Sequence, residues 1–395
     1  METPVRAWLT LGCVSLLFFL VTALTFSSLG VVLPAMVGEM GWSWGEAGMG
    51  FTLLGIFCGI TSTIPATMIR RLGVRATLLA GGAVMAAAFA VLAMTGGLVL
   101  YAIGCSLAGL GFTLLATVPG TFLLGRTFRR PDFAFGLYFT LGGLGGVAGP
   151  QFYHLVLAQA GGWRDFWWVS GGLTLAAALL GAALVDTRTD LTDARTQEIT
   201  SESWSAAAAL RTLQFSILAA AYSVFLIVDI TINAVSVPHL MRHGVAENDA
   251  DNLLSLIGLT NAGARLAGGL VSRLIKPRLL LLGALTVLII GLVALSSAQA
   301  ASLTLVYAAG IGIGSGLTFF AATILLLDYY GRGPNLELFS IVNVISTIGS
   351  VGPTFAGFVG DHTGSFVPAF VGLAVLVGMV LMAVLWMKPP HRVTP

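Results

Sequence analysis

Two ionisable residues stand inside long apolar segments of the sequence, Asp229 within residues 209–240 and Arg265 within residues 252–275. A charged side chain at the centre of a lipid bilayer costs about 3 kcal/mol on insertion scales, so such residues usually face a cavity inside the protein. Arg265 lies about ten residues, or roughly 15 Å at the helical rise, before Ile275 at the end of its segment. Its side chain cannot span that distance, and a guanidinium group keeps its proton at physiological pH. Arg265 therefore needs an anion or several hydrogen-bond acceptors at its own depth.

A guanidinium group can hold a carboxylate through two parallel hydrogen bonds, which makes Arg265 a candidate binding group for a small carboxylate. Asp229 is the deep carboxyl group of the chain and is the candidate proton carrier. An anion that engages Arg265 weakens the positive field at Asp229 and so favours protonation of Asp229. The alternative is a structural ion pair between the two residues. In antiparallel helices the rise per residue places them about 10 Å apart in depth, which argues against a permanent pair.

The composition is that of an integral membrane protein. Of the 395 residues, 57% are hydrophobic and 9% are charged, whereas soluble domains carry about 25% charged residues. The 50 glycine residues fit the same class, because membrane helices contain more glycine than soluble ones. The net charge of +2 leaves no basic surface for nucleic acid, and the three cysteines lack CxxC spacing. The sequence has no P-loop, HExxH or GxSxG motif, so we expect neither an enzyme nor a bound metal or cofactor.

Apolar segments of about 20 residues or more, the length that a helix needs to cross a bilayer, recur along the whole chain. Turn residues or charges separate twelve such segments, at residues 7–36, 43–69, 76–97, 100–125, 133–159, 165–185, 209–240, 252–275, 278–298, 302–327, 336–360 and 366–387. All but three of the 19 lysine and arginine residues fall on one side of the membrane if the N-terminus is cytoplasmic. The positive-inside rule then places both termini in the cytoplasm. Histidines near the expected outer ends either sense external pH or are solvated loop residues; they are His154, His239, His243 and His362.

The two halves of the sequence echo each other. The longest polar break, residues 186–205, divides the segments into six and six. Arg71 and Arg273 are separated by nearly the same number of residues as Pro150 and Pro353, and each pair stands at matching places in the two halves. Six-helix repeats with a substrate site at the midplane between them are a transporter architecture. We therefore expect an N-terminal six-helix bundle over residues 1–186, a cytoplasmic linker over 187–206 and a C-terminal six-helix bundle over 207–395.

Four stretches carry a resemblance to a known family: FSSLGVVLPAMVGEMGWSWGEAG, GRTFRRPDFAFGLYFTLGGLGG, IGLTNAGARLAGGLVSR and GSVGPTFAGFVGDHTGSFVPAF. The chain resembles the major facilitator superfamily along its whole length and, within it, monocarboxylate transporters and their bacterial oxalate/formate-antiporter-like relatives. This resemblance implies that Arg265 engages the carboxylate of the substrate. Two positions depart from the pattern. Arg70 in the loop ATMIRRLGVR stands where the superfamily's loop motif has an acid, and Asn261 stands where some relatives carry an acid one turn before the arginine.

These observations predict an all-α integral membrane protein with twelve transmembrane helices in two six-helix bundles, which is the major facilitator fold. Asp229 is the predicted proton-coupling residue. The predicted substrate-binding residues lie in segments that the resemblance places around a central cavity, and they are Arg265, Asn261, Asn233, Tyr138, Thr117, Phe26, Ser27, Phe319 and Asn343. Helix packing is an alternative role for the aromatic residues, and an interhelical hydrogen bond is one for the serine and the threonine.

The expected function is secondary active transport of small monocarboxylates such as lactate or pyruvate, by proton-coupled symport with alternating access. One deep arginine fits one carboxylate. The alternatives are a proton antiporter for drugs or other small solutes, which leaves Arg265 unexplained, and a dicarboxylate or formate exchanger. We expect a monomer in the cytoplasmic (inner) membrane. Its partners are a monocarboxylate anion, a proton and the lipid bilayer, with no nucleic acid.

Overall fold

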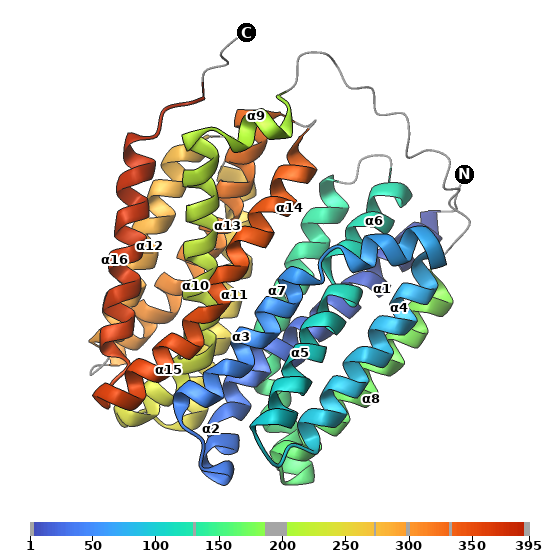
Figure 1. Cartoon of the computed structure of the whole chain (residues 1–395), viewed down its shortest axis with the longest axis vertical. Coiled ribbons are helices and arrows are strands. Elements are labelled where there is room, and N and C mark those ends of the chain that lie inside the picture. Colours follow the sequence, from blue (N-terminus) through green and yellow to red (C-terminus); the bar gives the residue numbers. More distant parts are fainter. Residues whose placement is uncertain are drawn as a thin grey trace. The chain divides into compact units, whose positions relative to one another are not determined.

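The protein is built from helices, as its computed structural model shows (Figure 1). The structure describes residues 4–128, 132–185, 204–271, 274–297, 301–331 and 334–390, and no strand occurs within these ranges. Nine helices in this part of the chain are long and apolar enough to cross a membrane, and Trp44–Ile60 is a shorter apolar helix. The prediction of an all-α integral membrane protein is thereby confirmed, because only helices and closed barrels satisfy their backbone hydrogen bonds in lipid.

The helices of the first half follow the apolar segments of the sequence. Several segments are divided by a bend or an irregular turn, so that one predicted span holds more than one helix. In chain order the helices are α1 (Pro4–Thr22), the π-helix η1 (Ala23–Ser27), α2 (Ser28–Met40), α3 (Trp44–Ile60), α4 (Ile64–Ala93), α5 (Leu98–Leu115), α6 (Thr117–Thr127), α7 (Asp132–Ala160) and α8 (Trp163–Leu184). Within α4 the chain bends at Gly73, whose φ of 83° is readily adopted only by glycine, and this bend lies at the predicted break RRLGVR.

The second half of the chain begins with a short helix. Its elements are α9 (Ala206–Leu210), α10 (Leu213–Arg242), α11 (Glu247–Val271), α12 (Pro277–Ser296), α13 (Ala301–Tyr330), α14 (Asn335–Ser346), the 3-10 helix η3 (Thr347–Val351), α15 (Gly352–Thr363) and α16 (Val367–Trp386). Pro353 lies in the first turn of α15, where its missing N–H costs no hydrogen bond and its fixed φ suits a helix start. The helix therefore restarts at this proline after the 3-10 turn.

The first span contains a π-helical turn between α1 and α2. The hydroxyl of Thr25 donates a hydrogen bond of 2.5 Å to the carbonyl of Val21. The hydroxyl of Ser28 donates one of 2.7 Å to the carbonyl of Ala23. Such side-chain hydrogen bonds satisfy carbonyl groups whose helical partners are displaced, and π-helical turns occur frequently at functional sites.

The chain divides into two compact units. The first consists of Met1–Thr189, Ile230–Leu259 and Ser350–Phe366, and the second consists of Asp190–Asp229, Thr260–Gly349 and Val367–Pro395. The helices α10 and α11 therefore each contribute one end to the first unit and the other end to the second. The same holds for the span formed by α14, η3 and α15.

An arginine contact recurs at matching positions of the two halves. Arg75 of α4 donates hydrogen bonds of 3.3 and 3.1 Å to the carbonyl of Val185, at the end of α8. Arg278 of α12 donates one of 3.2 Å to the carbonyl of Val384 and a second to that of Leu385, at the end of α16. The last carbonyls of a helix lack intrahelical partners and carry partial negative charge. Arg75 of α4 thus caps the end of α8, and Arg278 of α12 caps the end of α16.

These caps give a first prediction. Arg75→Ala and Arg278→Ala should each lower the apparent melting temperature of the purified protein in detergent by a few degrees, because each loses about 1 kcal/mol of hydrogen bonding. Thermal unfolding followed by intrinsic tryptophan fluorescence measures the shift. Arg71→Ala, which removes an exposed arginine of the same helix, is the control and should melt like the wild type. Unchanged melting of both cap variants would contradict the structural role of this repeated contact.

Candidate functional site

Arg265 lies inside α11 with its guanidinium group stacked on an aromatic ring of α13. Its guanidinium carbon is 4.4 Å from the centre of the Phe319 ring, close enough for a cation–π interaction. The side chain is half-buried, and its Nε is buried with no hydrogen-bond partner in the described part of the chain. A buried donor without an acceptor costs about 1–3 kcal/mol. The ring supports one face of the cation, and its Nε remains available for an acceptor.

Aromatic side chains surround Phe319. The ring of Tyr222 on α10 lies 5.8 Å from that of Phe319, and the ring of Phe225 lies 5.9 Å from it, centre to centre. The Tyr222 hydroxyl donates a hydrogen bond of 3.2 Å to Oδ1 of Asn343 on α14. The amide of Asn343 in turn donates one of 2.9 Å to the carbonyl of Phe339. Tyr222 thereby links the ring that supports Arg265 to the predicted site residue Asn343.

Tyr222 is absent from the predicted site, although a sequence signal for it exists. It precedes Asp229 by two helical turns, which places both residues on one face of α10. Aromatic residues are abundant in these segments, however, and most of them only pack between helices. The hydrogen bond to Asn343 separates Tyr222 from those residues, and it is visible only in three dimensions.

Asp229 lies on α10 and is half-buried. The structure places its carboxylate near enough to Arg265 for the two charges to stabilise each other. The helical rise alone indicates a separation of about 10 Å in depth. Depth along two helices does not fix how their side chains extend toward each other, so this separation does not exclude an interaction between the two charges.

Close contact between α11 and α13 positions Arg265 beside Phe319. A Cβ atom added at Gly316 would come within 2.4 Å of the main-chain oxygen of Asn261, so only glycine permits this approach. Asn261 lies one turn before Arg265 and is half-buried, and Gly316 lies one turn before Phe319. Small residues at helix interfaces allow such approach in membranes. Gly316 therefore holds the two helices in the register that stacks the cation on the ring.

The remaining predicted site residues belong to the first unit. Tyr138 of α7 is fully buried, and its hydroxyl donates a hydrogen bond of 2.8 Å to the carbonyl of Ala116, at the break between α5 and α6. The ring of Phe26 in η1 lies 5.5 Å from that of Phe112. Tyr138 thus stabilises an interrupted helix in this conformation, and Phe26 packs against Phe112 of α5.

Three further candidates can be placed only in part. Ser27 is buried, and a Cβ atom added at Gly149 of α7 would come within 2.9 Å of its Cβ. The main-chain oxygen of Asn233 lies against Gly30 of α2 in the same way, at 2.0 Å from a Cβ added there. The side chain of Thr117 lies outside the described part of the structure. The structure thus brings Arg265, Phe319, Tyr222, Asn343 and Asp229 together in the second unit.

The long apolar helices indicate a multi-pass membrane protein. The family model of the Major Facilitator Superfamily matches residues 15–350. The chain therefore belongs to this superfamily and is a transporter by family and fold, as the resemblance in its sequence indicated. A search of curated proteins finds no match to this sequence.

Solved structures share the fold at low sequence identity. A bacterial homologue of the human lysosomal transporter Spinster, inward-facing and unoccupied, is 14% identical with a TM-score of 0.76, over 98% of this chain and 96% of that chain. Its occupied, inward-facing form gives 14% identity and a TM-score of 0.77, over 98% and 97%. The nucleoside transporter NupG is 11% identical with a TM-score of 0.75, over 95% and 99%. At these identities the likeness defines the fold and leaves the solute open.

The contact at Gly316 gives a second prediction. Gly316→Ala should lower the apparent melting temperature by several degrees, because the added methyl group forces α11 from α13 and overpacking costs about 1–3 kcal/mol. Gly263→Ala on α11 is the matched control, since a Cβ there has open space. It should leave the melting temperature unchanged or raise it slightly, because alanine is a better helix former than glycine. A Gly316→Ala protein as stable as the wild type would contradict the close helix contact that positions Arg265.

Proposed function

We propose that this protein is a secondary active transporter of small monocarboxylates such as lactate or pyruvate, working by proton-coupled symport with alternating access. The observation that carries the proposal is the guanidinium group of Arg265, stacked on Phe319 with a buried Nε that has no acceptor among the described residues. A carboxylate completes this arrangement. It supplies charge and hydrogen-bond acceptors in the plane of the group, where a bidentate pair forms.

The surroundings of Arg265 favour a small substrate with a single carboxylate. Phe319 covers one face of the cation, and Tyr222 and Phe225 extend the apolar wall beside it. Such a wall suits the methyl group of a short organic acid. A second carboxylate needs a second cation, and the sequence of the eleventh span, FSIVNVISTIGSVGP, contains none. This favours a monocarboxylate over a dicarboxylate.

Asp229 supports proton coupling as part of the proposal. Its carboxylate and the guanidinium group of Arg265 stabilise each other in this structure. A substrate carboxylate that binds Arg265 competes for the same positive charge and thereby favours a proton on Asp229. Anion and proton then bind together, and the neutral pair crosses the membrane in one conformational cycle. Asn261 cannot replace Asp229 in this step, because an amide does not titrate.

The finer predictions from the sequence belong to the same proposal. The transporter has twelve transmembrane helices in two six-helix bundles and works as a monomer in the cytoplasmic membrane, with both termini in the cytoplasm. The repeated contacts of Arg75 and Arg278 support the two related halves. The charge distribution of the sequence supports the orientation.

Uptake by liposomes tests the substrate and the role of Arg265 together. Purified protein reconstituted in liposomes should take up labelled L-lactate, faster under an inward proton gradient. Arg265→Ala should lower the uptake rate by about 10- to 100-fold at subsaturating lactate, since a charge-assisted hydrogen bond contributes about 1.5–3 kcal/mol. Arg265→Lys should restore only part of the rate, because lysine keeps the charge and loses the planar fork.

Arg71→Ala is the control for reconstitution, because Arg71 is exposed on α4. It should transport like the wild type. Equal uptake by wild type and Arg265→Ala would mean that Arg265 is structural. If the wild type instead exports lipophilic cations under a proton gradient and takes up no lactate, the drug–proton antiporter is the correct function.

The proposed proton carrier gives a further prediction. Asp229→Asn should abolish the stimulation of lactate uptake by an inward proton gradient, because an amide cannot carry the proton. Exchange of labelled for unlabelled lactate across the membrane should continue, since it needs no net proton movement. Uptake and exchange are measured in the same liposome preparation. Gradient-stimulated uptake that survives in Asp229→Asn would show that another group carries the proton.

A further inference from the structure

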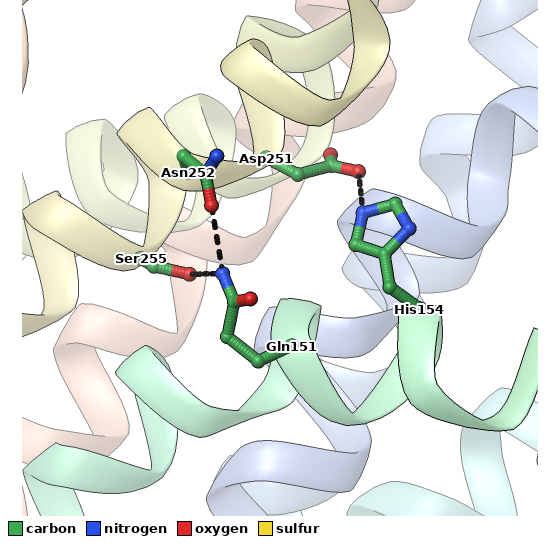
Figure 2. A network of polar contacts seen from close by, with 5 residues as sticks. All are labelled: Gln151, His154, Asp251, Asn252 and Ser255. Atoms are coloured by element: carbon green, nitrogen blue, oxygen red, sulfur yellow. Dashed lines mark hydrogen bonds and ion pairs between the residues drawn. The ribbon is translucent and has the colours of Figure 1, made fainter. Parts of the chain in front are cut away.

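A polar network joins α7 to the start of α11, within the first compact unit (Figure 2). Nε2 of His154 lies 2.6 Å from Oδ2 of Asp251. One turn earlier on α7, the amide of Gln151 donates hydrogen bonds of 2.9 Å to Oδ1 of Asn252 and 3.4 Å to the hydroxyl of Ser255. Gln151 and His154, one turn apart on α7, thus both bind residues in the first turns of α11.

This network lies at the end of the helices that the charge distribution places outside the cell. His154 is close to the end of the fifth apolar segment, and Asp251 immediately precedes the eighth, which begins at residue 252. The two helices belong to different halves of the sequence. An alternating-access cycle opens this end to admit the solute from outside, so the contacts between α7 and α11 must then break.

Asp251 is an unusual group for such a place. Its side chain has an exposed fraction of 0%, whereas that of His154 is 27%. Oδ1 of Asp251 is buried without a hydrogen-bond partner among the described residues. An ionised carboxylate in that position leaves one oxygen unsatisfied, which is costly. Protonation removes the charge, and the half-exposed His154 gives protons a route from the solvent to the pair.

The groups around Asp251 act in opposite directions. Three titratable groups face it: His154 and Tyr153 of α7, and Glu247 one turn earlier on α11. Burial raises the pKa of Asp251, His154 lowers it, the negative charge of Glu247 raises it, and together these influences raise the pKa of Asp251 to about 6. When α7 and α11 separate, solvation returns this carboxyl group to its ordinary pKa of about 4.

We propose that His154 and Asp251 form an external proton-sensing site, distinct from the carboxyl group of Asp229, which closes the outer ends of α7 and α11 when it binds a proton. The sign follows from linkage. In the joined state, α7 and α11 are in contact, and in the separated state they are apart. The pKa of Asp251 is higher in the joined state, so this state binds more protons than the separated state between about pH 6 and pH 4. Acid therefore favours the joined state, and this preference is lost as pH rises above 6.

The neighbouring contact of Gln151 provides the comparison within the same interface. Its partners Asn252 and Ser255 do not titrate, so this contact holds the two helices equally at every pH. External acid thus stabilises the contact between the outer ends of α7 and α11 through His154 and Asp251, and not through Gln151. The inference rests on the alternating access of the proposed function, but on none of the residues around Arg265.

The test measures the distance between the two helix ends directly. Spin labels on cysteines introduced at the exposed positions Gln159 and Asn248, with Cys13, Cys58 and Cys105 replaced, report this distance by pulsed electron paramagnetic resonance in nanodiscs. Between pH 7 and pH 5 the ratio of short to long distances should rise about tenfold, as expected for pKa values near 6 and 4. A ratio that does not change with pH would overturn the proposal.

Three variants in the labelled background assign the effect to its residues. Asp251→Asn should remove the pH dependence. His154→Gln should keep it and move its midpoint to higher pH, because the group that lowers the pKa of Asp251 is gone. Gln151→Ala should lower the ratio at every pH by the same factor. A pH response that persists in Asp251→Asn, or a midpoint that moves down in His154→Gln, contradicts the assignment.

The measurement needs no transported solute. Absence of lactate uptake would therefore refute the proposed substrate and leave the proton-sensing site to be judged by the distances alone. Conversely, a pH-independent distance would refute the sensing site while lactate uptake still depended on Arg265.

Discussion

The cation of Arg265 is the constraint on which the second unit depends. A guanidinium group cannot lose its proton to escape an apolar environment, so every neighbouring element has to accommodate a fixed charge. The ring of Phe319 supports one face of it, and Asp229 supplies part of the opposing charge. The buried Nε has no acceptor among the described residues. In a soluble core, an unsatisfied buried donor only lowers stability. In a transporter, a carboxylate substrate that accepts a hydrogen bond from this donor removes the energetic cost when it binds.

Close helix contacts give this charge its geometry. Gly316 lets α13 approach the backbone of α11, and Tyr222 holds the aromatic wall to α14 through Asn343. Several of the apolar segments are not uniform helices. A π-helical turn separates α1 from α2, a bend at Ala116 separates α5 from α6, and a 3-10 turn separates α14 from α15. Interrupted helices near the middle of spans provide points at which a transporter can change shape while its polar backbone groups stay satisfied.

Much of the architecture could be predicted from the sequence, because hydropathy reports burial in lipid directly. The apolar segments, the repeat of the two halves and the isolated charge of Arg265 are all local or periodic signals. Contacts between residues that lie far apart in the sequence leave no such signal. Gln151 and Asn252 lie far apart along the chain, and no pattern at either position indicates that they meet. For the same reason, the sequence pattern around His154 is also that of a solvated loop histidine. The break in the helix at Ala116 leaves no sequence signal, because it does not change the hydropathy of the apolar segment.

Ligand-dependent stability tests the central claim most directly, since it compares a carboxylate with its neutral counterpart at one site. The apparent melting temperature of the purified protein is measured with increasing L-lactate and, separately, with lactamide, for wild type and Arg265→Gln. A ligand that binds only the folded state raises this temperature. Lactate should stabilise the wild type, lactamide should not, and neither ligand should stabilise Arg265→Gln. Equal stabilisation of wild type and Arg265→Gln by lactate would contradict a carboxylate site built on this arginine.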